Sequence, residues 1–279
     1  MTSQGSILDE ILVRVRAEIE SSKAERSEES LQAMLADAPE LRSFRDAIAS
    51  GFGLIAEIKE RAPSRGVMRP ENVAHAPAAY DECPLVRAIS VLTNGSDFDM
   101  SVERLWETKL ATSKPILRKE FIVDRYQVLE ARAFGADAIL LMTQVGTASE
   151  LQVLYEYARG LELDVLVECG NRGDVDRAPA NAEIMGINAR DMHASSKHYE
   201  VSREASASTG EDLSIDMQLL KQIDLLPEGV LTVAESGITP ATIREVRDLG
   251  YHAALVGSDL LLNEQGVRAA LEEYEEALA

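Results

Sequence analysis

The sequence predicts an α/β protein built as one (β/α)₈ TIM barrel over residues 54–279, with extra N-terminal helices in residues 1–50. Eight short apolar runs rich in branched residues occur after residue 53, and a helical pattern follows nearly every run. Runs that are apolar on both faces and alternate with helices are typical of a parallel sheet covered by helices. Eight such units in about 225 residues match the size of a closed barrel.

The first fifty residues precede the first predicted strand. An amphipathic helix is predicted at the start of this part, because apolar residues recur there at helical spacing: Ile7, Leu8, Ile11, Leu12, Val15 and Ile19. Residues 21–30 are polar and are interpreted as a loop, and a second helical pattern runs from Leu31 to Ile48 across Pro39. The first helix either binds a partner or folds onto its own domain, and the second interpretation is favoured.

The expected strands and helices then alternate to the end of the chain. The strands are residues 54–59, 85–92, 115–121, 137–142, 164–169, 183–188, 230–236 and 253–258. The helices are residues 72–80, 101–110, 125–134, 147–159, 217–223, 240–249 and 267–278, with a weak pattern near Arg172. An open doubly wound sheet is the competing architecture, but no strand leads into a Gly-x-Gly-x-x-Gly turn.

Composition and charge exclude several classes of partner. The formal charge of −20 opposes binding to the phosphate backbone of nucleic acids and to anionic membranes. Two cysteines and four histidines show no metal-ligand spacing, so we expect no metal site. The sequence shows neither a secretory signal nor a run of about 18 apolar residues, which favours a cytoplasmic protein.

Charged residues recur where the predicted strands end. Glu57 and Lys59 stand two residues apart in the first strand and therefore project from the same side. This pair is either a solvated feature of an edge strand or part of a site. Similar polar residues close later strands, namely Lys119, Glu168, Asn188 with Arg190, and Glu235 with Ser236. Barrel closure would bring all of them to one mouth, where close charges shift each other's pKa values.

The last two strands lead into glycine turns that suit an anion. Gly237 is followed by Thr239 at a plausible N-cap and Pro240 at the first helical position. Gly257 and Ser258 repeat the turn after the eighth strand. Such turns and helix starts commonly hold phosphate in barrels, although glycines of this kind can also simply end strands. Candidate cations are Lys59, Arg61, Arg65, Lys119 and Arg190.

The ordered motifs resemble the indole-3-glycerol-phosphate synthase family of tryptophan biosynthesis over nearly the whole chain. The matching stretches are LIAEIKERAPSRG, AISVLT, ILRKEFIVDRYQVLEARAFGADAILLM, VLVE, GINAR, AESGI and LVGSDLL. The resemblance implies a lyase that needs no cofactor and closes the ring of 1-(2-carboxyphenylamino)-1-deoxyribulose 5-phosphate with loss of carbon dioxide and water. The partner is then a phosphorylated small molecule, and we expect a monomer or weak homodimer.

The resemblance also implies roles for individual residues. Lys119 resembles the general acid at the substrate ketone, and Glu168 resembles its partner carboxylate. Glu57 and Lys59 resemble the pair that assists dehydration. Asn188, Arg190, Glu235, Ser236 and Phe121 resemble groups that complete the polar ring and position the substrate. Ser64, Gly237, Gly257 and Ser258 resemble phosphate binders.

Some positions depart from the family pattern. Residues that differ are Arg65, Asn94, Met100, Glu120 and Ala189. The segment 191–217 is longer and more polar than usual, and it is a mobile lid, a contact surface or a solvated insertion. These differences leave two alternatives to the synthase: a relative with altered substrate in a specialised indole pathway, or a non-catalytic barrel that binds a phosphorylated ligand.

Overall fold

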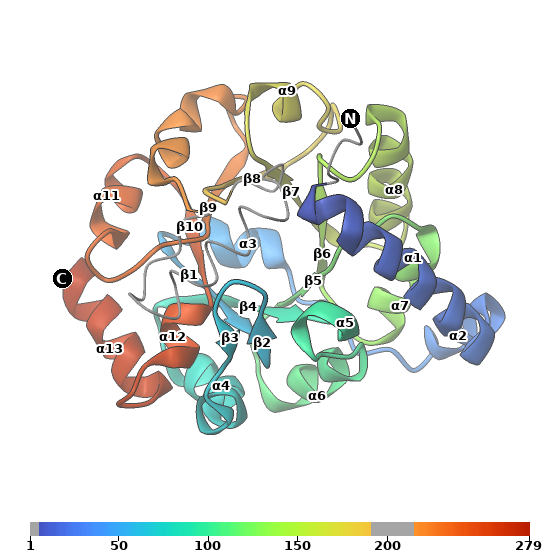
Figure 1. Cartoon of the computed structure of the whole chain (residues 1–279), viewed down its shortest axis with the longest axis horizontal. Helices are drawn as coiled ribbons and strands as arrows, with labels where there is room; N and C mark the ends of the chain where they lie inside the picture. Colours follow the sequence, from blue (N-terminus) through green and yellow to red (C-terminus); the bar gives the residue numbers. More distant parts are fainter. Residues whose placement is uncertain (1–5, 191–214) are drawn as a thin grey trace.

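The computed structural model describes residues 6–190 and 215–279, so most of the predicted loop 191–217 lies outside the described residues. Eight parallel strands close into a barrel in the order β1-β10-β9-β8-β7-β6-β5-β4 (Figure 1). The strands are β1 (Gly53–Ile58), β4 (Val86–Leu92), β5 (Ile116–Lys119), β6 (Ala138–Met142), β7 (Asp164–Cys169), β8 (Ile184–Asn188), β9 (Leu231–Glu235) and β10 (Ala253–Val256). Because β1 pairs with both β4 and β10, the predicted barrel is confirmed and the open sheet is wrong.

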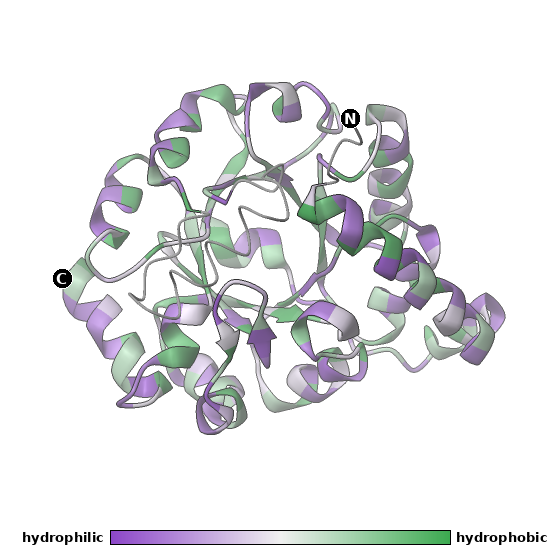
Figure 2. Cartoon of the chain, viewed as in Figure 1, coloured by the Kyte–Doolittle hydropathy of each residue, from purple (hydrophilic) through white to green (hydrophobic). Residues whose placement is uncertain are grey.

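Helices surround the barrel and follow the strands as predicted (Figure 1). They are α4 (Pro70–Glu82), α5 (Gly95–Phe98), α6 (Glu103–Ala111), α7 (Arg125–Ala133), α8 (Ala148–Gly160), α9 (Arg172–Val175), the 3₁₀ helix η1 (Met217–Leu225), α11 (Ile243–Asp248), α12 (Ser258–Leu262) and α13 (Val267–Leu278). Capping boxes at Asp124 and Thr147 fix the starts of α7 and α8. Hydrophobic and hydrophilic residues alternate around these helices (Figure 2), as expected when one helix face covers the sheet.

The N-terminal extension folds onto the barrel. It comprises α1 (Ile7–Glu25), α2 (Glu28–Met34) and α3 (Phe44–Ala49). Two ion pairs of 2.7 Å anchor α1, one from Arg14 to Asp97 and one from Lys23 to Asp124. The interpretation of residues 21–30 as a loop is wrong, because α1 continues to Glu25 and only Arg26 and Ser27 separate it from α2. The segment contains no glycine or proline, so its polar residues simply occupy exposed helix positions.

A short hairpin follows β1 and was not predicted. Its two strands, β2 (Arg61–Ala62) and β3 (Gly66–Val67), pair antiparallel. The turn between them carries Ser64 and Arg65, and Gly66 adopts a left-handed φ of 76° that closes it. The hairpin therefore brings the polar loop after β1 back toward the barrel.

The N-terminal ends of the strands contain a buried ion pair. Lys109 Nζ lies 2.5 Å from Asp137 Oδ1, and the two side chains are 1% and 0% exposed. The same carboxylate accepts the backbone N–H groups of Arg42 and Ile116, each at 2.7 Å. This cluster ties the extension, α6 and two strands together. Among the described helices, none has the length and apolar character required to cross a membrane.

Candidate active site

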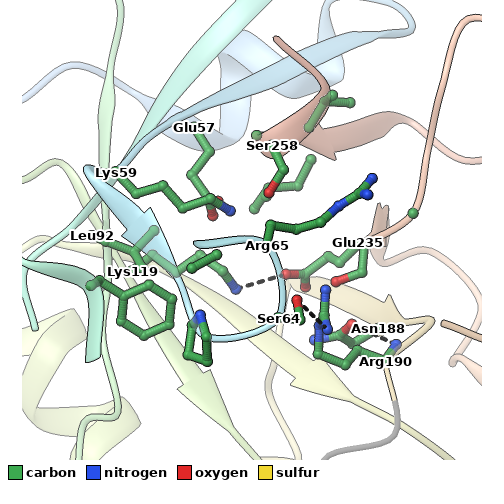
Figure 3. A pocket seen from close by; sticks show the side chains of 18 of the residues that line it. Glu57, Lys59, Ser64, Arg65, Leu92, Lys119, Asn188, Arg190, Glu235 and Ser258 are labelled. Atoms are coloured by element: carbon green, nitrogen blue, oxygen red, sulfur yellow. Dashed lines mark hydrogen bonds and ion pairs between the residues drawn. The ribbon is translucent and has the colours of Figure 1, made fainter. Parts of the chain in front are cut away.

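A cavity of about 530 Å³ opens at the C-terminal ends of the barrel strands. Every site residue predicted from the sequence lines it except the candidate cation Arg61, whose guanidinium lies 3.7 Å from the Asp99 carboxylate, and Figure 3 shows many of them pointing into the same space. These residues are Glu57, Lys59, Ser64, Lys119, Phe121, Glu168, Asn188, Arg190, Glu235, Ser236, Gly237, Gly257 and Ser258. Residues from six different strands or the loops after them thus share one site.

Lys119 occupies the centre of this site at the end of β5. Its Nζ lies 3.1 Å from Glu168 Oε2 and 3.3 Å from Glu235 Oε2. Burial alone would lower the pKa of Lys119, but the charges of Glu168 and Glu235 outweigh it and raise that pKa above its ordinary value. Asn188 donates from Nδ2 to Glu168 Oε1 at 2.9 Å. Lys119 is therefore held protonated, with Glu168 oriented against it.

Glu235 is the second carboxyl beside Lys119. Burial first, and then the nearby charge of Glu168, raise its pKa to about 8, although Lys119 acts in the opposite direction. Its Oε1 is buried and has no hydrogen-bond partner among the described residues. A Cβ built on Gly186, in the adjacent strand β8, would collide with that oxygen. Glu235 thus holds a proton near neutral pH and has one oxygen available.

Glu57 and Lys59 form a second charged pair. Lys59 Nζ lies 2.5 Å from Glu57 Oε1, and the residues are only 8% and 3% exposed. The prediction that they share one side is confirmed, and the alternative of a solvated edge strand is wrong because β1 is paired on both sides. Gly257 leaves space for Glu57, since a Cβ there would collide with Glu57 Oε1. The buried Tyr80 hydroxyl donates to the Glu57 carbonyl at 3.1 Å.

The loops after β1 and β8 meet across the cavity. Arg190 donates from one guanidinium nitrogen to Ser64 Oγ at 3.2 Å (Figure 3), and its backbone N–H donates to Asn188 Oδ1 at 2.9 Å. Ser64 is 2% exposed, so its side chain is buried although it belongs to the hairpin turn. The Arg190–Ser64 contact therefore ties the loop after β8 to the hairpin after β1.

The turn after β9 has the backbone form that the glycine suggested, but the helix after it starts later than predicted. Ser236 and Gly237 adopt successive left-handed φ values of 71° and 70°. The assignment of Thr239 as N-cap and Pro240 as first helical residue is wrong, because α11 begins at Ile243 with Thr242 as its N-cap. Thr242 Oγ1 accepts the backbone N–H of Thr239 at 3.0 Å, which completes a separate turn before the helix.

Several cavity residues were not predicted as site residues. Glu120 is buried, and it accepts from Thr93 Oγ1 at 2.7 Å and from the Phe121 backbone N–H at 2.9 Å. Burial raises its pKa. The departure at RKEF pointed to this position, but nothing in the sequence placed Thr93 beside it. Other lining residues outside the prediction include Ile11, Asn94, Phe98 and Asp259.

Comparisons with known proteins give a family match over nearly the whole chain. A family model described as indole-3-glycerol phosphate synthase matches residues 8–274. The chain is 35% identical to the indole-3-glycerol phosphate synthase of Campylobacter concisus (strain 13826), over 97% of this chain and 99% of that protein. It is also 35% identical to the enzyme of the same name from Kineococcus radiotolerans, over 96% of this chain and 94% of that protein.

Solved structures share the fold at much lower identity. Thiamine phosphate pyrophosphorylase from Pyrococcus furiosus superposes with a TM-score of 0.55 at 17% identity, covering 85% of this chain and 98% of that one. The 3-hexulose-6-phosphate synthase of Salmonella typhimurium superposes with a TM-score of 0.53 at 13% identity, covering 82% and 98%. These two similarities extend to the barrel architecture alone.

Proposed function

The chain belongs to the indole-3-glycerol phosphate synthase family, and we propose that the residues around Lys119 divide that family's reaction among them. The reaction is the decarboxylating, dehydrating ring closure of 1-(2-carboxyphenylamino)-1-deoxyribulose 5-phosphate to indole-3-glycerol phosphate in tryptophan biosynthesis. The observation that carries the proposal is one protonated lysine held between two buried glutamates, with a second buried ion pair in the same cavity.

Lys119 is the proposed general acid for ring closure. Carbon attack on the substrate ketone develops negative charge on the ketone oxygen, and a protonated amine can stabilise that charge or donate a proton. The attacking ring becomes cationic at the same time. Asn188 holds the Glu168 carboxylate, which lies 3.1 Å from the Lys119 amine. This carboxylate is proposed to stabilise the cation.

Glu57 and Lys59 are proposed to assist the later loss of water. Dehydration requires a proton to reach the departing hydroxyl and another to leave a neighbouring atom. An acid and a base in direct contact at 2.5 Å can serve both needs. Glu235 is proposed as a proton reserve for either stage, because its pKa of about 8 lies close to neutral pH.

The remaining residues are proposed to hold the substrate. The planar fork of Arg190 suits the anthranilate carboxylate, and Phe121 suits contact with the aromatic ring. The turns at the far end of the cavity are proposed to bind the phosphate through backbone N–H groups and hydroxyls; they contain Ser64, Ser236, Gly237, Gly257 and Ser258.

A relative with altered substrate preference is the second candidate function. It is favoured by one observation: Asn94 and Glu120, two of the departures from the family pattern, both line the cavity. For either candidate we propose a cytoplasmic protein that acts as a single unit and as a monomer or weak homodimer, since a formal charge of −20 opposes self-association.

An assay of the purified chain in metal-free buffer tests the proposal. The protein is incubated with the carboxyphenylamino-deoxyribulose phosphate, and indole absorbance and product mass are followed. Formation of indole-3-glycerol phosphate is expected. Binding of the substrate without turnover would instead support a non-catalytic barrel, and turnover of a ring-substituted analogue in preference to this substrate would support the second candidate.

A further inference from the structure

The cavity contains an acidic residue at the end proposed to bind phosphate. Asp259 follows Ser258 in the first turn of α12 and lines the cavity. Its acidic companions in the lining are Glu57, Glu120, Glu168 and Glu235, and the basic residues are Lys59, Arg65, Lys119 and Arg190. Glu57, Glu168 and Glu235 have proposed catalytic roles, and Glu120 is hydrogen-bonded to Thr93. Asp259 has no proposed catalytic role, and it lies at the end of the cavity where the phosphate of the ligand is proposed to bind.

Hydrogen bonds hold Asp259 in this position. The hydroxyl of Tyr274, on α13, lies 2.9 Å from Asp259 Oδ2 and 2.8 Å from the carbonyl oxygen of Ile238. Tyr274 is completely buried, so it has little freedom to move. Ile238 directly follows Gly237, and Asp259 follows Gly257 by two residues. Tyr274 therefore contacts both glycine turns. The carboxyl of Asp259 is fixed relative to both turns.

The charges around Asp259 make it relevant to anion binding. Burial raises the pKa of Asp259 and the charge of Glu273 adds to the rise, while the hydrogen bond from Tyr274 and then the charge of Arg65 act in the opposite direction. Arg65 and Ser258 lie at the same end of the cavity (Figure 3). When Asp259 is ionised, it repels a phosphate dianion and also offsets part of the positive field of Arg65.

We propose that Asp259 lowers the affinity of the cavity for phosphate. This inference rests on the proposed phosphate end of the site. The ligand and the product of the proposed reaction both carry phosphate, so a site that bound this group too tightly would retain product. Asp259 limits that affinity, and Tyr274 keeps its carboxyl at a constant distance from the two turns.

The test measures the affinity of the full-length protein for inorganic phosphate at pH 8 and constant ionic strength. Asp259→Asn keeps the shape and an oxygen that can accept from Tyr274, but it removes the charge. We expect it to bind phosphate roughly tenfold more tightly, as loss of a nearby like charge in a partly wet site predicts. Asp248→Asn is the matched control, because Asp248 is exposed on α11 outside the cavity lining.

One further variant separates the possible outcomes. Ser258→Ala removes a proposed phosphate contact and should weaken binding several-fold. Unchanged or weaker phosphate binding by Asp259→Asn overturns the inference. If Ser258→Ala nevertheless weakens binding, the phosphate end itself stands and only the role of Asp259 is wrong. If neither substitution alters binding, the proposed phosphate end is wrong as well.

Discussion

Two lysines, one at each end of the barrel, are paired with buried carboxylates in different ways. At the N-terminal end, Lys109 meets Asp137 at 2.5 Å, and both oxygens of that carboxylate also accept backbone N–H groups. At the C-terminal end, Lys119 is shared between Glu168 and Glu235, its side chain is 20% exposed, and one Glu235 oxygen has no partner among the described residues.

The difference separates a structural cluster from a chemical one. A buried carboxylate whose hydrogen bonds are all made can gain nothing from a ligand, and its loss leaves an uncompensated charge. A cluster with spare bonding capacity and a raised pKa can exchange protons with a bound molecule. In a barrel of this type, the N-terminal end supports stability and the C-terminal end supports function.

The substitution expected to have the largest effect is Lys119→Met. We expect turnover to fall by roughly 10²- to 10⁴-fold, the usual contribution of general acid catalysis. The fold should survive, because Glu168 and Glu235 can share a proton once the lysine is absent. Turnover and circular dichroism are measured together, with the exposed Lys221→Met as control. Unchanged turnover would remove Lys119 from the mechanism.

Gly186→Ala tests whether the position of Glu235 matters. The added methyl group must displace the Glu235 carboxyl, and a displacement of about 1 Å in an active site can cost on the order of 10²-fold in rate. Gly160→Ala is the matched control, since a Cβ at Gly160 meets nothing within 4 Å. Equal kcat/KM values for the two variants would show that Glu235 tolerates displacement.

Lys109→Met should produce the reverse of the Lys119 result. Breaking a buried ion pair costs about 3 to 5 kcal/mol of unfolding free energy, and we expect about 3 because Asp137 keeps its two backbone donors. Turnover per folded molecule should change by less than about twofold, since the pair lies at the opposite end of the barrel. Urea unfolding and an assay at low temperature measure both quantities. A large loss of turnover with intact stability would abolish the distinction between the two ends.

Glu235→Gln should remove the loss of stability that ionisation of this buried carboxyl causes as pH rises. Folding raises the pKa of Glu235 from 4.5 to about 8, so the folded protein binds more protons than the unfolded chain within this window. The wild type therefore loses stability as pH rises from 4.5 to 8, and the glutamine variant lacks this loss. Above pH 8 we therefore expect the variant to be more stable than the wild type. Parallel pH profiles of unfolding would contradict the raised pKa.

The sequence predicted the parts of the site that local pattern controls. Glu57 and Lys59 could be placed on one side from the period of a strand, and Lys119 could be placed near Glu168 because parallel strand ends meet at one mouth. It did not predict Glu120 against Thr93 or Asp259 against Tyr274, because those contacts join segments that no local pattern relates. The start of α11 was misplaced because Thr242, rather than Thr239, supplies the hydroxyl that ends the turn.

Closure of the barrel also dictates an order of events during synthesis of the chain. The register pairs Gly53 with Ala253, so a ribosome makes the first strand about 200 residues before the strand that completes it. At roughly 5 to 20 residues per second, β1 waits ten seconds or more with one edge uncovered. The Arg14 and Lys23 anchors of α1 find their partners, Asp97 and Asp124, within about the first 125 residues. The N-terminal helix can therefore dock against α7 before the barrel closes.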